Sequence, residues 1–235
     1  MQPVYKFKHS GDLGDIIFSL PTVRALGGGV LYLDPLGAET AKSVKDFKTK
    51  LSLKSALGMK DFLSTQEYIT DVKIWAGEEI DYNLDSFRDN IKYNNLVISH
   101  LSAFNLDKDI SKNQWIDVQE KIQLPKQFII SRSVRYHSNY PFWVELLKKI
   151  KNDSVFIGLE KEHEIFEYTF EVSIPYYPTP TIKDLAIAIN SCEQIFCNQS
   201  LPHAIAEGLH HSLVCEIFRV YPAAVFENKV SSIYV

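Results

Sequence analysis

The sequence contains few cysteines and no long apolar run. Its 235 residues include only Cys192, Cys197 and Cys215, an odd number placed within apolar segments. This pattern is typical of buried thiols in a reducing compartment and not of disulfides or a metal site. The sequence also lacks a run of about 18 apolar residues and a secretory leader. These absences predict a cytoplasmic protein with no transmembrane segment and no bound metal.

An excess of positive charge is missing as well. Lys and Arg number 25 and Asp and Glu number 29, which gives a formal net charge of −4. Proteins that bind nucleic-acid backbones usually present a basic surface, so the composition argues against a nucleic-acid partner. Hydrophobic residues make up 46% of the chain and charged residues 23%, as in globular proteins. A chain of this length has room for one large domain or two small ones.

The glycine patterns of the common nucleotide-binding loops are absent, because neither a Walker A loop nor GxGxxG occurs. The segment His9–Asp15 instead lies between a predicted strand, Val4–Phe7, and a predicted helix, Asp15–Leu26. The free N–H groups at such a helix start can bind an anion or a reacting oxygen. The carboxylate of Asp15 either caps this helix or faces a site above the sheet. The spacing alone leaves both interpretations open.

The first half of the chain, residues 1–124, shows a clear strand–helix pattern only at its start. Pro21 should kink the first helix. Asp81, Asp85 and Arg88 are interpreted as the exposed start of a helix. The other predicted elements are a strand over Val30–Asp34, a helix over Glu39–Lys50, a strand over Tyr68–Trp75 and a helix over Ser86–Phe104.

The second half, residues 125–235, alternates short apolar strands with amphipathic helices. This alternation is typical of a parallel sheet with helices on both faces, as in Rossmann-like domains. The predicted strands are Gln127–Ser131, Ser154–Leu159, Val172–Ile174, Gln194–Cys197 and Leu213–Ile217. The predicted helices are Phe142–Ile150, Lys161–Tyr168, a helix through Ile189 capped by Thr181, and Leu201–Leu209.

Two loops that follow strands of this half are suited to phosphate. Arg132 and Arg135 follow the first strand, and guanidinium groups pair bidentately with phosphate oxygens. In the other loop Ser200 suits the N-cap and Pro202 the first helical position, so the helix start after Asn198 can hold a phosphate. A solvated loop and a well-capped helix remain the respective alternatives.

A third loop carries glutamates at the start of a predicted helix. Glu160, Glu162 and Glu164 follow the strand that ends at Leu159. A carboxylate in this position can accept hydrogen bonds from both ribose hydroxyls of a nucleotide. Glutamates in a first turn also simply favour the helix dipole. Glu160 is the preferred ribose ligand.

The segment Gly14–Pro21 resembles the Gly-Asp-x-x-x-x-(Thr/Leu)-Pro signature of glycosyltransferase family 9, the heptosyltransferase-like enzymes. The resemblance implies a short, divergent member of the glycosyltransferase-B superfamily, with an α/β fold of two Rossmann-like halves facing a crevice and a reduced N-terminal half. Residues 1–124 would bind the acceptor and residues 125–235 the nucleotide sugar. Asp15 would be the catalytic base, with His9 and Gly14 on the acceptor side.

The segment Asn198–His203 resembles the family's Asp-Ser-Gly-x-x-His loop, with departures. Ser200 matches outright, whereas Gln199 replaces the aspartate, Leu201 the glycine and Ala204 the histidine; His203 is one position early. The resemblance implies donor binding, and the predicted phosphate ligands are Arg132, Arg135, Asn198, Gln199, Ser200 and His203.

These observations predict a metal-independent inverting glycosyltransferase that needs no cofactor besides its nucleotide-sugar donor. It would transfer a hexose or heptose to a hydroxyl of a glycan, a protein or a modified nucleobase. The departures in the second loop favour one alternative, a non-catalytic relative that binds a nucleotide sugar or a partner protein. A sugar-nucleotide epimerase is the other alternative.

Overall fold

The computed structural model describes residues 4–35, 51–91, 95–138, 140–226 and 232–235. The chain divides into two units, Met1–Asp117 and Val118–Val235. The boundary predicted at residue 124 therefore lies inside the second unit. Within the described ranges, no helix combines the length and apolar character needed to cross a membrane.

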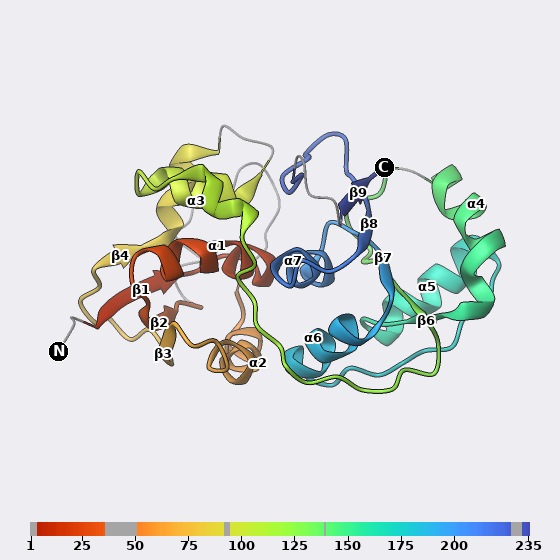
Figure 1. Cartoon of the computed structure of the whole chain (residues 1–235), viewed down its shortest axis with the longest axis horizontal. Coiled ribbons are helices and arrows are strands. Elements are labelled where there is room, and N and C mark those ends of the chain that lie inside the picture. The colour runs from red at the N-terminus through yellow and green to blue at the C-terminus, as the bar shows by residue number, and fades with distance from the viewer. Residues whose placement is uncertain (1–3, 36–50, 92–94, 139, 227–231) are drawn as a thin grey trace. The chain divides into compact units, whose positions relative to one another are not determined.

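The first unit contains a sheet of four parallel strands (Figure 1). The strands are β1 (Tyr5–His9), β2 (Gly29–Leu33), β3 (Ile69–Ile74) and β4 (Tyr82–Asn83), in the order β3-β2-β1-β4. The strand order reverses between β1 and β4. In open parallel sheets, ligands bind beyond the carboxyl ends of the strands at this switch point. The loops that follow His9 and Asn83 are therefore where a site is expected.

Helices of the first unit bury apolar faces against the sheet and against each other. They are α1 (Leu13–Ala25), α2 (Leu53–Leu63), α3 (Leu96–Ala103) and the 3₁₀ helices η2 (Leu84–Asn90) and η3 (Lys108–Lys112). α1 packs against α3, and α2 packs against β3. The predicted buried face of α1 is confirmed, because Ile16, Ile17, Leu20 and Val23 are fully buried, and Pro21 lies within the helix.

The long helix predicted over Ser86–Phe104 is wrong. The structure has η2 and then a separate helix, α3. Asn95 starts α3, because its side chain accepts a hydrogen bond from the Ile98 N–H at 3.1 Å. An asparagine that caps a helix start in this way begins a new helix. The helix predicted over Glu39–Lys50 lies outside the described residues.

The second unit contains a five-stranded parallel sheet, which confirms the predicted fold class. Its strands are β5 (Phe128–Ser131), β6 (Ser154–Phe156), β7 (Gln194–Asn198), β8 (Leu213–Glu216) and β9 (Ser232–Tyr234), in the order β6-β5-β7-β8-β9. The switch point lies between β5 and β7. Figure 1 shows the helices of this unit, which are α4 (Tyr140–Ile150), η4 (Lys151–Asp153), α5 (Glu160–Phe170), α6 (Ile182–Ser191) and α7 (Leu201–Gly208).

Two local predictions in this unit have different outcomes. The cap at Thr181 is confirmed, because its hydroxyl accepts a hydrogen bond from the Asp184 N–H at 3.0 Å. The strand predicted over Val172–Ile174 is wrong. The Ile174 N–H donates to the carboxylate of Glu167 at 2.7 Å and is not part of a strand ladder.

Gly29, the first residue of β2, allows β2 and β1 to approach closely. Gly29 has φ +150°, and a Cβ added there would lie 2.1 Å from the backbone oxygen of Tyr5 on β1. We expect Gly29→Ala to lower the free energy of unfolding by at least about 2 kcal/mol, because the clash and the backbone strain add. Chemical denaturation measures this loss.

Gly58 provides the matched control. It lies within α2 with nothing within 4 Å of an added Cβ. Gly58→Ala should stabilise the protein by about 0.5–1 kcal/mol, as alanine does in an exposed helix. Equal effects of the two substitutions would contradict the packing described for Gly29.

Candidate functional site

The loop after β1 leads directly into α1. Asp12 occupies the N-cap position, and its carbonyl accepts the Ile16 N–H at 3.0 Å. Gly14 and Asp15 lie in the first turn, so α1 begins two residues earlier than predicted. The side chain of Asp15 is 25% exposed.

The carboxylate of Asp15 faces an arginine from another element. Arg88 Nη2, on η2, lies 3.9 Å from Asp15 Oδ2. A Cβ added at Gly11 would lie 2.9 Å from each of these two atoms and 2.6 Å from the ring of His9. Only glycine therefore fits beneath the pair, and its small size allows the two charged groups to converge.

Asp85 on η2 is the hub of this cluster. Its carboxylate accepts the Ser10 N–H at 3.1 Å, the Ser10 hydroxyl at 2.8 Å, Arg88 Nη1 at 2.6 Å and Lys8 Nζ at 3.3 Å. Burial by itself would raise the pKa of Asp85, but His9, Arg88 and the Ser10 hydrogen bonds outweigh it and hold that pKa well below its usual range.

The sequence interpretation of Asp85 and Arg88 as an exposed helix start is therefore wrong. Their side chains are only 15% and 26% exposed, and they bind the loop that follows β1. Both residues follow the two-residue strand β4, which pairs with β1 and so places them at the β1/β4 switch point. Such a short strand leaves almost no signal in the sequence, and the Asp85–Arg88 spacing alone is typical of any helix surface.

Two buried histidines lie behind this cluster. His9, at the end of β1, accepts the Gly11 N–H at Nδ1 at 2.9 Å and is fully buried. His100 on α3 is also fully buried and stacks on Phe87 at 4.0 Å between ring centroids. Burial lowers the pKa of His9 to about 4 and the pKa of His100 well below its usual value, so both are neutral at pH 7. Through its hydrogen bond with the Gly11 N–H, neutral His9 helps to fix the loop after β1.

The environment of Asp15 favours the protonated carboxyl group. Burial, followed by the negative charges of Asp12 and Asp85, raises the pKa of Asp15 to about 7, while Arg88 opposes the rise. A pKa near the working pH is the property that a general base needs. Among the predicted site residues, Asp15 is thus the one whose surroundings fit catalysis.

In the second unit Arg132 has an internal partner. Its Nε and Nη2 atoms donate to the carboxylate of Glu216 at 2.8 and 3.3 Å, and its guanidinium lies over the rings of Trp143 and Phe170. Glu216 is fully buried and also accepts the Trp143 indole N–H at 2.8 Å and the Ser138 N–H at 2.7 Å. The contacts between Arg132 and Glu216 join the ends of β5 and β8. The role of Arg132 in phosphate binding stays a prediction.

The amide side chains after β7 also bind neighbouring loops. Asn198 accepts the Ser133 N–H at 2.9 Å and donates to the carbonyls of Ser133 and Arg135. Gln199 accepts the Phe218 N–H at 2.6 Å and donates to the Tyr221 carbonyl. Asn198 thus joins the two loops at the β5/β7 switch point and fixes the loop that carries Arg135, whose side chain is exposed.

α7 begins at this switch point. Ser200 is the N-cap residue, but its hydroxyl donates to the Asn198 carbonyl at 3.0 Å and does not cap the first turn. His203 lies inside the unit, with 1% of its side chain exposed and Nε2 3.8 Å from the buried carboxylate of Glu207. The structure therefore brings Asn198, Ser200 and the Arg135 loop together and places the ring of His203 in the core.

The glutamates of α5 differ in their exposure. Glu160, the first residue of α5, is exposed. Glu162 accepts the Leu159 N–H at 3.1 Å, and its partial burial raises its pKa. Of the two, Glu160 leaves its carboxylate accessible to a ligand.

Within the described ranges, no three or more His, Cys, Asp or Glu side chains are grouped so that they could hold a metal ion. The three cysteines are free and buried.

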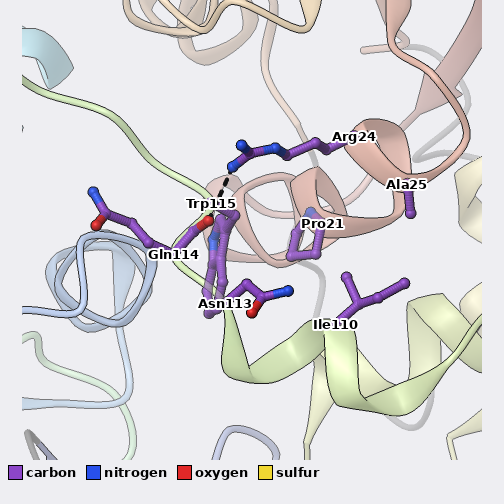
Figure 2. A pocket seen from close by; sticks show the side chains of 7 residues that line it. All are labelled: Pro21, Arg24, Ala25, Ile110, Asn113, Gln114 and Trp115. Carbon is purple, nitrogen blue, oxygen red and sulfur yellow. Dashed lines mark hydrogen bonds between the residues drawn. The ribbon is translucent and has the colours of Figure 1, made fainter.

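A pocket of about 340 Å³ lies between the C-terminal part of α1 and the segment from η3 to Trp115 (Figure 2). Arg24 crosses its rim and donates to the Gln114 carbonyl at 3.1 Å. The lining residues are Pro21, Arg24, Ala25, Ile110, Asn113, Gln114 and Trp115. None of them is a predicted site residue.

The sequence matches no family model and no curated protein. Solved structures do resemble the fold. A glycosyl transferase of family 9 from Veillonella parvula aligns with a TM-score of 0.57 at 12% identity, covering 100% of this chain and 87% of that one. E. coli ADP-heptose lipopolysaccharide heptosyltransferase II aligns with 0.55 at 14% identity, over 99% and 90%. E. coli heptosyltransferase WaaC with ADP-2-deoxy-2-fluoro heptose aligns with 0.55 at 7% identity, over 98% and 92%. The chain thus has the fold of these glycosyltransferases, as predicted.

The buried pair of Arg132 and Glu216 predicts a large loss of stability on substitution. Arg132→Met should lower the free energy of unfolding by about 3–5 kcal/mol, because Glu216 would keep its charge without its cationic partner. Arg135→Met, at an exposed side chain, should change it by less than about 0.5 kcal/mol. Urea denaturation of both variants measures the difference. Similar stabilities would contradict a structural role for Arg132.

Proposed function

We propose that the protein is a glycosyltransferase in which Asp15 activates the acceptor. The observation that carries the proposal is the Asp15 carboxylate itself. It lies in the first turn of α1 at the switch point of the first sheet, is 25% exposed, and has a pKa raised to about 7 mainly by burial. The fold shared with family 9 structures supports the same reaction class.

In the proposed reaction Asp15 takes the proton of an acceptor hydroxyl as that oxygen attacks the anomeric carbon of the donor. The bond between the anomeric carbon and the phosphate oxygen breaks, and the nucleoside diphosphate leaves with the bonding electrons. A single in-line displacement of this kind inverts the anomeric configuration. Gly14 and the buried His9 shape the loop that presents Asp15 to the acceptor.

The second unit would bind the donor. The N-terminus of α7, which the Ser200 hydroxyl leaves uncapped, offers backbone N–H groups and a partial positive charge to the diphosphate. Arg135, on the loop fixed by Asn198, adds a full positive charge. Together they would stabilise the leaving group without a metal ion. Glu160 would accept hydrogen bonds from the ribose.

The similar structures guide the choice of donor sugar to test. Two of the similar structures are named for ADP-heptose or contain an ADP-heptose analogue. ADP-heptose and ADP-hexoses are therefore the first donors to test. A glycan hydroxyl is the preferred acceptor, ahead of a protein or a modified nucleobase. The free cysteines are consistent with a cytoplasmic location.

One alternative has an observation in its favour. The side chains of Arg132, Asn198 and Gln199 are all engaged within the second unit, so the donor would be held by other groups and three predicted ligands would take no part in stabilising the leaving group. This alternative predicts donor binding without turnover.

Asp15→Asn tests the proposal. Asparagine has nearly the size and shape of aspartate, but its neutral amide cannot accept the proton. We expect the variant to bind the donor normally and to lose turnover on the order of 10²–10⁴-fold. Thermal shift measures binding, and release of nucleoside diphosphate from ADP-sugars in the presence of mixed glycan acceptors measures turnover. EDTA should change neither quantity.

Full turnover in Asp15→Asn would contradict the role of Asp15. Donor binding without turnover in the unmodified protein would favour the non-catalytic alternative. Lack of stabilisation by any nucleotide or nucleotide sugar would contradict both.

A further inference from the structure

Arg88 is the cationic group that the structure places against Asp15. It lies on η2, outside the segment that resembles family 9, and no part of the proposed reaction uses it. The two terminal nitrogen atoms of its guanidinium face different carboxylates. Nη1 donates to Asp85 at 2.6 Å, and Nη2 lies 3.9 Å from Asp15 Oδ2. The guanidinium also lies over the ring of Phe87, with 4.7 Å between Cζ and the ring centroid.

The partners of Asp85 fix this arginine in place. Asp85 binds both the N–H and the hydroxyl of Ser10, so η2 and the loop after β1 are held together. Lys8 bridges Asp85 and the buried carboxylate of Asp34. The arginine that approaches Asp15 is thus anchored to the same loop that carries Gly11, where only a glycine fits.

Within the described ranges, the other charged groups that shift the pKa of Asp15 are acidic, and the two histidines nearby add no positive charge at neutral pH. Asp12 on its own loop and Asp85 on η2 are acidic. His9 on β1 and His100 on α3 are buried and neutral. Arg88 therefore counters two acidic neighbours.

We propose that Arg88, anchored by Asp85, is a positioning residue that orients the Asp15 carboxylate and counteracts its protonation. The consequence for catalysis rests on the proposed function, whereas the effect on the Asp15 carboxylate does not. An ionised Asp15 is the form that can accept a proton from a hydroxyl. Without the arginine, the acidic neighbours and the buried surroundings would favour the protonated form.

Carboxyl-carbon NMR of the full chain labelled at aspartate measures the effect directly, with Asp15→Asn to assign the signal. We expect Arg88→Gln to raise the titration midpoint of Asp15 by about 1 pH unit or more, as loss of an adjacent opposite charge does. Arg24→Gln is the matched control, because Arg24 lies at the other end of α1 and binds the Gln114 carbonyl. It should leave the midpoint unchanged. Arg88→Lys keeps the positive charge, so its Asp15 midpoint should lie close to that of the unmodified protein. This variant provides the comparison if Arg88→Gln does not fold.

The pH profile of turnover separates this inference from the proposed function. If Asp15 is the base, the acidic limb for Arg88→Gln moves upward with the NMR midpoint, turnover falls about five-fold near pH 7, and it recovers toward about pH 9. An NMR shift without a matching limb shift would support the role of Arg88 and contradict Asp15 as the base. An unchanged NMR midpoint in Arg88→Gln, or the same shift in Arg24→Gln, would overturn the inference.

Discussion

The carboxylate of Asp85 holds the candidate site of the first unit together. Four donor groups converge on it, two of them from Ser10 in the loop after β1. A partly buried carboxylate with this many donors stays ionised, and it can then hold a neighbouring arginine in one orientation. The start of α1, the position of Arg88 and the surroundings of Asp15 all depend on this one anion. The absence of a side chain at Gly11 leaves the space in which they meet.

The second unit uses buried polar side chains for a related purpose. The carboxylate of Glu216 accepts hydrogen bonds from Arg132, Trp143 and Ser138. The side chain of Asn198 forms hydrogen bonds with the loop from Ser133 to Arg135. Removing one member would leave a buried charge or amide without its partner, which costs more than the intact contact contributes. These side chains therefore fix the loops at the β5/β7 switch point. Among the described residues, the side chains of Arg135 and Glu160 are exposed, and the proposed donor site uses them together with the backbone at the start of α7.

Much of this fold could be predicted from the sequence, because alternating apolar strands and amphipathic helices are local patterns. The buried face of α1 and the cap at Thr181 follow directly from residue spacing. The break between η2 and α3 was missed, because a single Asn95 cap is a weak signal within an apolar stretch.

The candidate site was less predictable, since its members come from distant segments. Asp15 was singled out by the resemblance of Gly14–Pro21 to a family signature, since its position near a helix start left a cap and a site residue both open. Asp85 and Arg88 could not, because β4 is only two residues long and the pairing of its end with β1 is a tertiary feature. The partnership of Arg132 with Glu216, 84 residues apart, is invisible in the sequence for the same reason. A loop arginine suited to phosphate and one that forms an internal ion pair look alike until the fold is known.

The central claim is that the fold holds Asp15 as a carboxylate whose charge is disfavoured. The pKa of Asp15 is raised from its ordinary value to about 7, so its protonated form stabilises the folded state at low pH and this contribution is lost as the pH rises toward 7. The direct measurement is the free energy of unfolding of the unmodified protein and of Asp15→Asn across this range. The account predicts nearly equal stabilities near pH 4 and an advantage for the asparagine variant of about 4 kcal/mol near pH 8. A difference between the two proteins that does not change with pH would contradict it.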